Sequence, residues 1–312
     1  MGQRPELDAF AMLREKVTGT FLENEPMARH TSYGIGGPAR AYITPANQED
    51  LAAILRFAQE NNMPTFFSGS GSNLLVADEG FDGIVITLGK SFTRLSIEGS
   101  RIEAEVGVML GKMVKETTKR NLTGLESMIG VPGTLGGALV MNAGAFGGEI
   151  SNCLDTINVM TMNGTTKTYK QSEIDFSYRH STFPADEILV SAAFTLTEKP
   201  AEEIQSQRAQ ASQGRKDTQP LRFRSAGSVF KNPKPDLAAG YLIDQAGLKG
   251  TRQGDAEISP KHANFFVNHG QAKAADVVTL IRLAKKTVQE KFDVNLELEI
   301  KTLGFAPGTF TI

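Results

Sequence analysis

Apolar residues recur at helical spacing in several parts of the chain, and each recurrence predicts an amphipathic helix. Asn47 is suited to cap one of these helices, with Asp50 expected as its reciprocal partner in a capping box. The helices predicted in this way cover residues 5–17, 48–60, 108–119, 238–246 and 274–290.

Short apolar or alternating runs bounded by glycine, proline and asparagine predict strands. Asn163-Gly164 separates two such runs and is the strongest hairpin signal in the chain. Many strands with few helices in the first two thirds of the chain indicate an α+β fold. The predicted strands are residues 39–43, 65–67, 74–76, 84–88, 101–106, 157–162, 165–169, 188–196, 265–267 and 296–301.

A change in composition predicts a domain boundary at Lys199-Pro200. Residues 201–216 are polar and helical in pattern with little apolar face, as expected of a helix that links two domains. We therefore expect an N-terminal helical segment over 1–30, one domain over 31–200 and a second over 201–312.

Composition narrows the class of protein. The chain has 312 residues, 40% hydrophobic and 22% charged, and is long enough for two domains with a sizeable core. Its formal net charge of -2 gives no electrostatic reason to expect nucleic acid or an anionic membrane as partner. The single cysteine, Cys153, excludes an intrachain disulfide and fits a reducing compartment. There is no long apolar run and no basic-then-apolar signal pattern, so we expect a cytoplasmic protein.

Two glycine-rich stretches are the candidates for ligand binding. One runs from Gly124 to Gly148, and the other, SGSGSNLL over residues 68–75, follows a predicted strand. Backbone amides without side-chain bulk can face a large ligand such as a phosphate group or a fused ring. The second stretch is not a Rossmann GxGxxG, because Leu74 to Val76 continues as a strand, and the chain has no Walker A motif. Both stretches are also compatible with tight turns that bind no ligand.

Taken together, the motifs resemble the UDP-N-acetylenolpyruvoylglucosamine reductase family. They occur in the family's order and cover nearly the whole chain after residue 30. The matching segments are TSYGIGGPA (31–39), SGSGSNLL (68–75), GLESMIGVPGTLGGALVMNAGAFGGEI (124–150), FSYRHSTF (176–183), SAGSVFKNP (225–233), AGYLIDQAGLKG (239–250), ISPKHANFFVN (258–268) and LELEIKTLG (296–304).

The resemblance implies an α+β fold: a PCMH-type FAD-binding domain in two lobes and a C-terminal α+β substrate-binding domain. It also implies the reaction. NADPH, the co-substrate, reduces FAD, and UDP-N-acetylglucosamine enolpyruvate is then reduced to UDP-N-acetylmuramate, a precursor of peptidoglycan. The chain has no room for the tyrosine-bearing insertion that part of the family carries, so it resembles the short type. The implied partners are small molecules, and we expect a monomer.

Hydride addition to an enolpyruvyl group leaves negative charge beside a carboxylate, so the site needs a proton donor and groups that stabilise an enolate. The resemblance implies Ser228 as the donor, Arg179 as the ligand of the carboxylate, and Glu299 as the catalytic glutamate. Serine is a poor acid, and Lys231, three residues along, could supply a nearby cation. The residues alone favour plainer interpretations. Ser228 is then a hydroxyl in a turn, Arg179 is a surface arginine, and Glu299 lies with Glu297 on the solvated face of a strand.

The resemblance also implies binding residues. For the FAD pyrophosphate they are Gly69, Ser70, Gly71, Ser72 and Asn73. For the isoalloxazine and ribityl chain they are Gly130, Pro132, Gly133, Thr134, Gly136, Gly137, Asn142 and Ala143, with Tyr33 and Gly36 on the adenine side. For the uridine diphosphate or pyruvyl end of the substrate they are Lys231, Asn232, Lys249, His262 and Asn264. The four histidines show no metal-ligand spacing, so no metal site is expected.

Two other functions stay open at this point. An oxidase of the same FAD-binding type would leave the SAGSVFKNP segment and the terminal glutamate without a role. A nucleotide-sugar-binding regulator without catalysis is the other alternative, although Arg179, Ser228 and Glu299 are all present. The sequence departs from the family pattern at His180, where an acidic residue is common, and at Arg224, where a proline is common.

Overall fold

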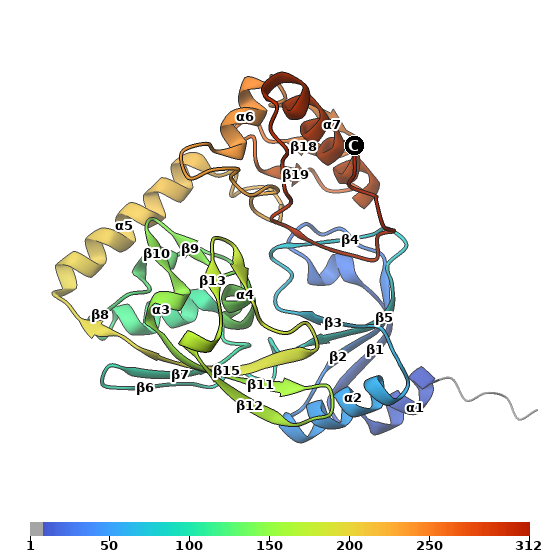
Figure 1. Ribbon diagram of the computed structural model, residues 1–312, viewed down its shortest axis with the longest axis vertical. Coiled ribbons are helices and arrows are strands. Elements are labelled where there is room, and N and C mark those ends of the chain that lie inside the picture. Colours follow the sequence, from blue (N-terminus) through green and yellow to red (C-terminus); the bar gives the residue numbers. More distant parts are fainter. Residues whose placement is uncertain (1–8) are drawn as a thin grey trace, which may run out of the picture. The chain divides into compact units, whose positions relative to one another are not determined.

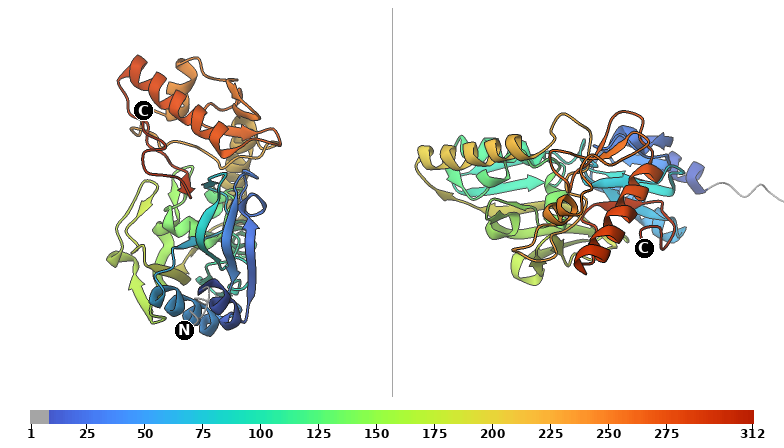
Figure 2. Two further views of the ribbon diagram at one scale, coloured as in Figure 1. Left: turned by 90° about the vertical axis from the view of Figure 1, so that its right-hand side faces the viewer. Right: turned by 90° about the horizontal axis from the view of Figure 1, so that it is seen from above.

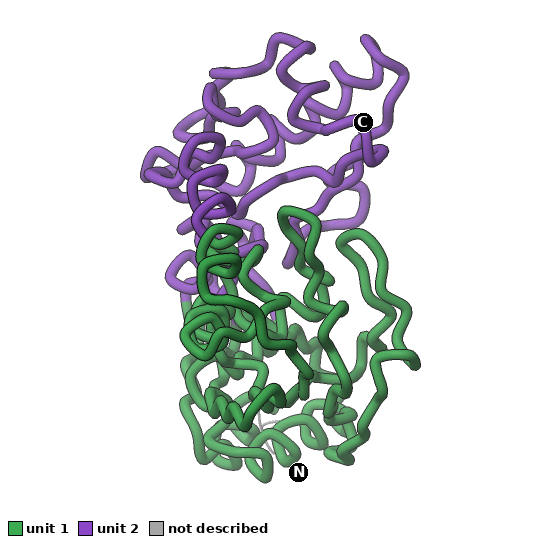
Figure 3. Tube along the Cα trace, turned by 90° about the vertical axis from the view of Figure 1, so that its left-hand side faces the viewer, with its two compact units in different colours: residues 1–25, 40–69, 83–208 green, residues 26–39, 70–82, 209–312 purple. Residues whose placement is uncertain are grey.

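The computed structural model describes residues 9–312, and Figure 1 shows the order of the elements along the chain. The chain divides into two compact units (Figure 3). Of the described residues, unit 1 contains 9–25, 40–69 and 83–208, and unit 2 contains 26–39, 70–82 and 209–312. Each unit has its own hydrophobic core, so each is described separately.

A five-stranded antiparallel sheet and a four-stranded sheet form most of unit 1. The larger has the order β12 (Thr166–Lys170), β11 (Leu154–Thr161), β15 (Glu187–Thr195), β7 (Arg101–Glu105) and β6 (Leu95–Glu98). The smaller has the order β1 (Thr20–Pro26), β2 (Pro38–Thr44), β5 (Phe81–Thr87) and β3 (Thr65–Ser68), with β3 parallel to β5. The Asn163-Gly164 hairpin is confirmed, because β11 and β12 pair across it and Gly164 has φ +78°.

The helices of unit 1 bury apolar stripes against these sheets. α1 (Ala9–Lys16) and α2 (Gln48–Glu60) lie against each other (Figures 1 and 2). α3 (Leu110–Thr118) and the short α4 (Leu135–Val140) contribute Leu110, Val114 and Leu139 to the same core. The first predicted helix is confirmed over α1, and its residues 5–8 lie outside the described part of the chain.

Short elements connect the larger ones in unit 1. Three two-stranded pairs are β8 (Leu122–Thr123) with β16 (Thr197–Glu198), β9 (Gly144–Ala145) with β10 (Gly148–Glu149), and β13 (Phe176–Ser177) with β14 (His180–Ser181). The 3-10 turns are η2 (Glu126–Met128), η3 (Ile150–Cys153) and η4 (Gln171–Glu173). The predicted polar helix is confirmed as α5 (Ala201–Thr218), which begins in unit 1 and ends in unit 2.

Unit 2 packs two helices with two small sheets. α7 (Ala274–Phe292) buries Val277, Ile281 and Val288 and runs beside the antiparallel sheet β17 (Arg252–Gln253), β18 (Ala256–Ile258) and β19 (Phe266–Asn268) (Figure 2). α6 (Ala239–Gln245) packs on α7, and η1 (Met27–His30) also belongs to this unit. β4 (Leu74–Val76) is parallel to β20 (Lys301–Leu303), which confirms a strand after the SGSGSN loop.

Three details of the sequence prediction differ from the structure. Asn47 caps α2 as expected, but Asp50 accepts hydrogen bonds from the backbone of Thr18, Gly19 and Ala46 instead of completing a capping box. The predicted strand 296–301 is wrong: a regular strand begins only at Lys301, because the preceding residues form only an isolated antiparallel bridge, between Leu298 and Phe230. The sequence pattern also does not predict β6 or any of the two-residue strands, and it misses β1, which lies within the segment 1–30 that was expected to be helical.

No helix in the described part of the chain, residues 9–312, is long and apolar enough to cross a membrane.

Candidate functional site

In unit 1, Gly69 of the SGSGSNLL loop (residues 68–75) lies directly against the glycine-rich segment from Gly124 to Gly148. Gly69 begins the loop that follows β3, and a Cβ at this position would lie 2.6 Å from Thr134 Oγ1 and 4.0 Å from the amide nitrogen of Gly137. A side chain at residue 69 would fill this space, so glycine is required for the close approach of the two loops. At this point the backbones of the two loops come close together without side-chain bulk between them. Such exposed backbone fits the binding of a large flat or phosphorylated group, in agreement with the role in FAD binding that the resemblance implies for these loops.

Backbone hydrogen bonds fix the part of the Gly124–Gly148 segment that runs from Gly130 to Gly137. Gly130 and Gly133 have φ of +76° and +127°, conformations that residues with a side chain rarely adopt. Leu110 donates to the Gly133 carbonyl at 2.9 Å, and Gly136 donates to the Val106 carbonyl at 2.9 Å. The loop is therefore held in place by Val106, which follows β7, and by Leu110, the first residue of α3.

Asn142 follows α4 within the Gly124–Gly148 segment and is completely buried. Its Nδ2 donates to Glu149 Oε2 at 2.8 Å and to the Ser177 carbonyl at 3.1 Å. Its Oδ1 is buried and has no hydrogen-bond partner among the described residues. An orphaned acceptor of this kind fits a ligand that brings its own donor.

Arg179 lies in the tight turn between β13 and β14. Its φ of +56° is unusual for a residue with a long side chain, and backbone strain of this kind concentrates at functional sites. The guanidinium carbon lies 5.1 Å from the centre of the Tyr178 ring. The hairpin is anchored on the glycine-rich segment, because Ser181 Oγ donates to the Val140 carbonyl at 2.7 Å.

The remaining loop residues, Ser70 to Asn73, belong to unit 2. A Cβ at Gly71 would lie 1.9 Å from the His30 carbonyl oxygen, and the backbone of residue 71 has φ +66°. Asn73 Nδ2 donates to the Glu299 carbonyl at 3.1 Å, and Lys301 donates to the Asn73 carbonyl at 2.9 Å. The loop is thus joined to the C-terminal segment that carries Glu299.

Ser228 and Glu299 are brought together in unit 2 although they are far apart in the sequence. The Glu299 amide donates to the carbonyl of Val229, the neighbour of Ser228, at 2.8 Å. Ser228 itself forms a bridge with Phe265. Both side chains are half-buried, which leaves each of them partly accessible to a ligand.

Asn264 holds the Ser228 segment in position. Its Oδ1 accepts from the Phe230 amide at 2.9 Å and its Nδ2 donates to the Phe230 carbonyl at 2.8 Å. Its carbonyl accepts from the Val229 amide at 2.8 Å. Both ends of the buried amide are therefore used internally, by the backbone of Phe230.

The other substrate-binding candidates are partly engaged with neighbours in unit 2. Lys231 Nζ lies 3.9 Å from Glu297 Oε2, Asn232 Oδ1 accepts from the Ala239 amide at 3.1 Å, and Lys249 Nζ lies 2.6 Å from Asp244 Oδ2. Burial, followed by the charge of Lys249, lowers the pKa of His262, which keeps its imidazole neutral near pH 7.

Tyr33 and Gly36, the expected adenine-side residues, lie in unit 2. Tyr33 is completely buried in that core, burial raises the pKa of its phenol well above the usual value, and its hydroxyl has no partner among the described residues. Gly36 has φ +137°, and a Cβ there would lie 2.8 Å from Val76 Cβ. Packing alone therefore requires this glycine.

Sequence reasoning missed two acidic residues of unit 1. Glu149 holds the Asn142 amide, and the buried Glu126 accepts from Thr123 Oγ1 at 2.5 Å and from the Gly124 amide at 2.6 Å. The sequence signal that could have identified them is their position, because Glu126 lies inside the Gly124–Gly148 segment and Glu149 directly follows it. A carboxylate buried in such a stretch needs hydrogen-bond donors close by.

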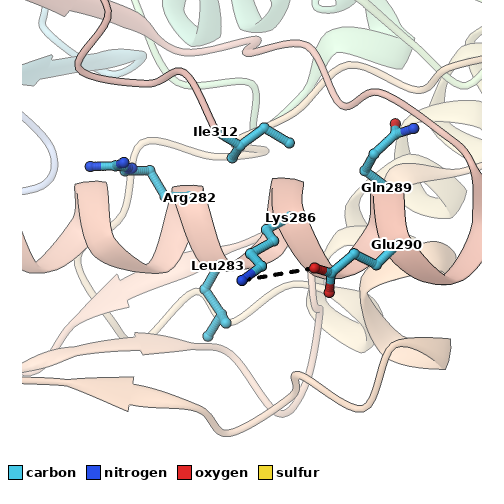
Figure 4. Close-up of a pocket in the computed structure, with 6 residues that line it drawn as sticks. All are labelled: Arg282, Leu283, Lys286, Gln289, Glu290 and Ile312. Carbon is cyan, nitrogen blue, oxygen red and sulfur yellow. Dashed lines mark ion pairs between the residues drawn. The ribbon is translucent and has the colours of Figure 1, made fainter.

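A surface hollow of about 480 Å³ lies on the outer side of α7 (Figure 4). Lys286 and Glu290, which form an ion pair at 3.8 Å, lie on its wall. The full lining is Arg282, Leu283, Lys286, Gln289, Glu290 and Ile312. These residues include none of the candidates above, so the hollow is distinct from the candidate site.

Comparison with known proteins places the chain in one family. Residues 219–303 match the family model for the UDP-N-acetylenolpyruvoylglucosamine reductase C-terminal domain, and residues 39–170 match that for an FAD binding domain. A UDP-N-acetylenolpyruvoylglucosamine reductase from Agathobacter rectalis is 43% identical over 91% of this chain and 94% of its own length. One from Syntrophus aciditrophicus is 42% identical over 94% and 95%.

A solved structure agrees with these relatives. The crystal structure of UDP-N-acetylenolpyruvylglucosamine reductase from Thermus caldophilus superposes with a TM-score of 0.79 at 39% identity, covering 90% of this chain and 98% of the other. The predicted α+β fold with an FAD-binding domain is confirmed. The chain is an FAD-binding oxidoreductase and belongs to the UDP-N-acetylenolpyruvoylglucosamine reductase family.

Proposed function

We propose that the protein reduces UDP-N-acetylglucosamine enolpyruvate to UDP-N-acetylmuramate, with NADPH as the electron donor and FAD as the carrier. This reaction supplies a precursor of peptidoglycan, and we place it in the cytoplasm, carried out by a monomer on small-molecule substrates. The observation that carries the proposal is the joining of Ser228 and Glu299 through the Val229–Glu299 hydrogen bond. The names of the relatives support the choice of substrate.

When bound, FAD supplies hydride transfer from a nicotinamide to the enolpyruvyl double bond. The residues proposed to hold it are those of the two glycine-rich loops, residues 69–73 and 130–143, within a domain that we expect to cover residues 31–200. Gly69 gives the backbone its close approach to Thr134, and Asn142 offers a free buried acceptor. We expect residues 201–312 to bind the substrate.

Ser228 is proposed to deliver a proton to the carbon next to the substrate carboxylate. A serine hydroxyl is acidic enough only if a strong base takes its proton or a cation stabilises the alkoxide. Lys231 is the nearest lysine in the sequence, and its ion pair with Glu297 is loose at 3.9 Å, with the Glu297 side chain 79% exposed. A lysine held so weakly is available to turn toward an anionic substrate.

Arg179 is proposed to bind the substrate carboxylate and the negative charge that develops beside it. A guanidinium presents two parallel N–H donors that match a carboxylate, and its charge does not titrate near neutral pH. The strained turn between β13 and β14 fixes the backbone from which this side chain extends. Its placement therefore costs little reorganisation when the charge develops.

Glu299 is proposed to act on the substrate through its carboxyl group. Its backbone is fixed from two sides, by the Val229 carbonyl and by Asn73 Nδ2, so its side chain starts from a defined point. A carboxyl beside a bound carboxylate has its pKa raised and can then hold a proton.

Ser228→Ala tests the assignment of the proton donor. We expect the variant to retain FAD and to be reduced by NADPH at the normal rate, whereas turnover of the enolpyruvyl substrate falls at least about a thousandfold, as expected for loss of a general acid. Rapid-mixing absorption measurements follow each half-reaction separately. Normal turnover by this variant would remove Ser228 from the mechanism.

A further inference from the structure

Ser228 lies at the end of a short antiparallel pairing in unit 2. Arg224 forms a bridge with Asn268, and Ser228 forms a bridge with Phe265. At the first bridge the Asn268 amide donates to the Arg224 carbonyl at 2.9 Å. The two bridges fix how the segment before Ser228 is aligned with the chain at β19.

The two sides of this pairing differ in length by one residue. Ser228 lies four positions after Arg224, whereas Phe265 lies three positions before Asn268. An antiparallel pair with one extra residue on one side contains a β-bulge, and a shift of one residue turns the side chains beyond it to the other face. The extra residue therefore decides which face Ser228 occupies.

Gly227, directly before Ser228, provides the backbone geometry of the bulge. Its φ is +77°, in the left-handed region that one common kind of bulge requires of its first residue and that glycine adopts about as readily as the right-handed one. No atom of the described residues lies within 4 Å of the position that a Cβ at residue 227 would occupy. Glycine is therefore needed here for its backbone conformation and not for space.

The bulge places Ser228 on the same face as Phe265, because residues directly opposite each other in an antiparallel pair share a face. Without the extra residue, Ser228 would lie opposite Asn264, which is buried and whose side-chain amide is bonded to the backbone. The Phe265 ring lies 4.8 Å from the ring of His262, one of the substrate-binding candidates. The bulge thus turns Ser228 toward the face on which these two rings lie.

The residue after Ser228 is held from two sides. Val229 is completely buried, and its amide donates to the Asn264 carbonyl at 2.8 Å. Its carbonyl accepts from the Glu299 amide, also at 2.8 Å. Because both backbone groups of Val229 are fixed, the direction of the Ser228 side chain depends on the conformation of Gly227.

We propose that the left-handed bulge at Gly227 turns the Ser228 hydroxyl toward the substrate, so that Gly227 is a positioning residue for the proton donor. This inference rests on the proposed function, in which Ser228 is that donor. A side chain at residue 227 disfavours the left-handed conformation, and a return to the regular register moves Ser228 to the opposite face. Loss of this glycine therefore acts on proton delivery and not on reduction of the flavin.

The test measures the two half-reactions of the full-length, FAD-bound protein in three variants. Gly227→Ala adds a Cβ to the left-handed backbone without a clash, and Gly227→Asn adds a side chain that tolerates this conformation better. Gly308→Ala is the matched control, because Gly308 lies in the same unit, has φ +80° and would place its Cβ 4.0 Å from the nearest atom. Chemical denaturation measures the stability of each variant.

We expect Gly227→Ala and Gly308→Ala to lose similar, small amounts of stability and to be reduced by NADPH at the wild-type rate. In Gly227→Ala, reoxidation of the flavin by the enolpyruvyl substrate should slow about tenfold, through kcat and not KM, because the productive orientation of Ser228 is populated less. Gly227→Asn should stay within about threefold of the wild type. Gly308→Ala should reoxidise at the wild-type rate.

The double variant Gly227→Ala/Ser228→Ala shows whether residue 227 acts through Ser228. If it does, adding Gly227→Ala to Ser228→Ala causes no further slowing, because residues that act as one unit have non-additive effects. A full additional loss of about tenfold would show that Gly227 acts by another route and would overturn the inference.

The outcomes separate this inference from the proposed function. A wild-type protein that binds FAD but does not reduce the enolpyruvyl substrate would overturn both. Normal turnover by the wild type, with Gly227→Ala as fast as Gly308→Ala, would overturn only the role of Gly227. The same holds if Gly227→Asn is as slow as Gly227→Ala, or if Gly227→Ala fails to fold while Gly308→Ala folds, because the residue would then act on the structure as a whole.

Discussion

The candidate residues of the two units reach their positions in different ways. In unit 1 most of them lie on one nearly continuous stretch, from Gly130 to Ala143, whose shape is set by glycines in unusual backbone conformations. In unit 2 the candidate residues come from separate parts of the chain: Ser70–Asn73, the candidates between Ser228 and Asn264, and Glu299. Hydrogen bonds between these parts, such as that from the Glu299 amide to the Val229 carbonyl, join them. The first arrangement depends on local backbone geometry, and the second depends on long-range contacts.

The two arrangements predict different sensitivities to substitution. Where geometry is local, an added side chain acts on its immediate neighbour and can be compensated there. Where several segments meet, loss of one contact affects the whole junction. Three substitutions and one control variant can break or sharpen this distinction, and the three are given below from the largest expected effect to the smallest.

Gly71→Ala should have the largest effect. The new Cβ would lie 1.9 Å from the His30 carbonyl oxygen, and the residue would also hold φ +66°. Since the obstacle is backbone, we expect the free energy of unfolding to fall by about 3 kcal/mol or more. Chemical denaturation measures this.

Gly99→Ala is the control for Gly71→Ala. It has a similar φ of +58° but nothing within 4 Å of a Cβ, so we expect a cost of only about 1 kcal/mol from the backbone conformation. Equal losses in the two variants would show that the junction at His30 does not matter.

Asn264→Ala should have an intermediate effect that reaches catalysis. It removes both side-chain hydrogen bonds to Phe230 and leaves the buried Phe230 amide and carbonyl without these partners. We expect the free energy of unfolding to fall by about 2 kcal/mol. We also expect slower turnover, because Ser228 lies only two residues before Phe230 in the chain. Unchanged turnover in a folded variant would show that Asn264 does not position Ser228.

Gly69→Ala should have the smallest effect and should be compensated locally. Its Cβ would lie 2.6 Å from Thr134 Oγ1 but 3.9 Å from Thr134 Cβ. The single variant should lose about 1 kcal/mol of stability, and Thr134→Ala in the same chain should restore part of that loss. Strictly additive losses in the double variant would contradict the contact between the two loops.

Much of the fold follows from patterns that act over a few residues. The Asn163-Gly164 turn, the apolar stripes of α2 and α7 and the strand after the SGSGSN loop are all set by local spacing, and the structure confirms them. The boundaries of the two units are different, since residues 26–39 and 70–82 join the C-terminal part through contacts that no local pattern encodes.

The candidate site divides along the same line. The glycine-rich loops are visible in the sequence because positive φ and close approach select glycine. The partners of Asn142, the internal use of the Asn264 amide and the complete burial of Tyr33 depend on residues distant in sequence, so the sequence could suggest these residues but not their contacts. The same reason explains the error at residues 296–301, where alternation indicates one buried face but an isolated bridge between Leu298 and Phe230 replaces a ladder.

The most direct test of the proposed function is the absorption spectrum of the purified FAD-bound protein without oxygen. NADPH is added first, and UDP-N-acetylglucosamine enolpyruvate second. We predict that NADPH bleaches the flavin band and that the substrate restores it, with formation of one UDP-N-acetylmuramate per flavin. A band that bleaches but returns only when oxygen is admitted would contradict the proposed function and favour an oxidase.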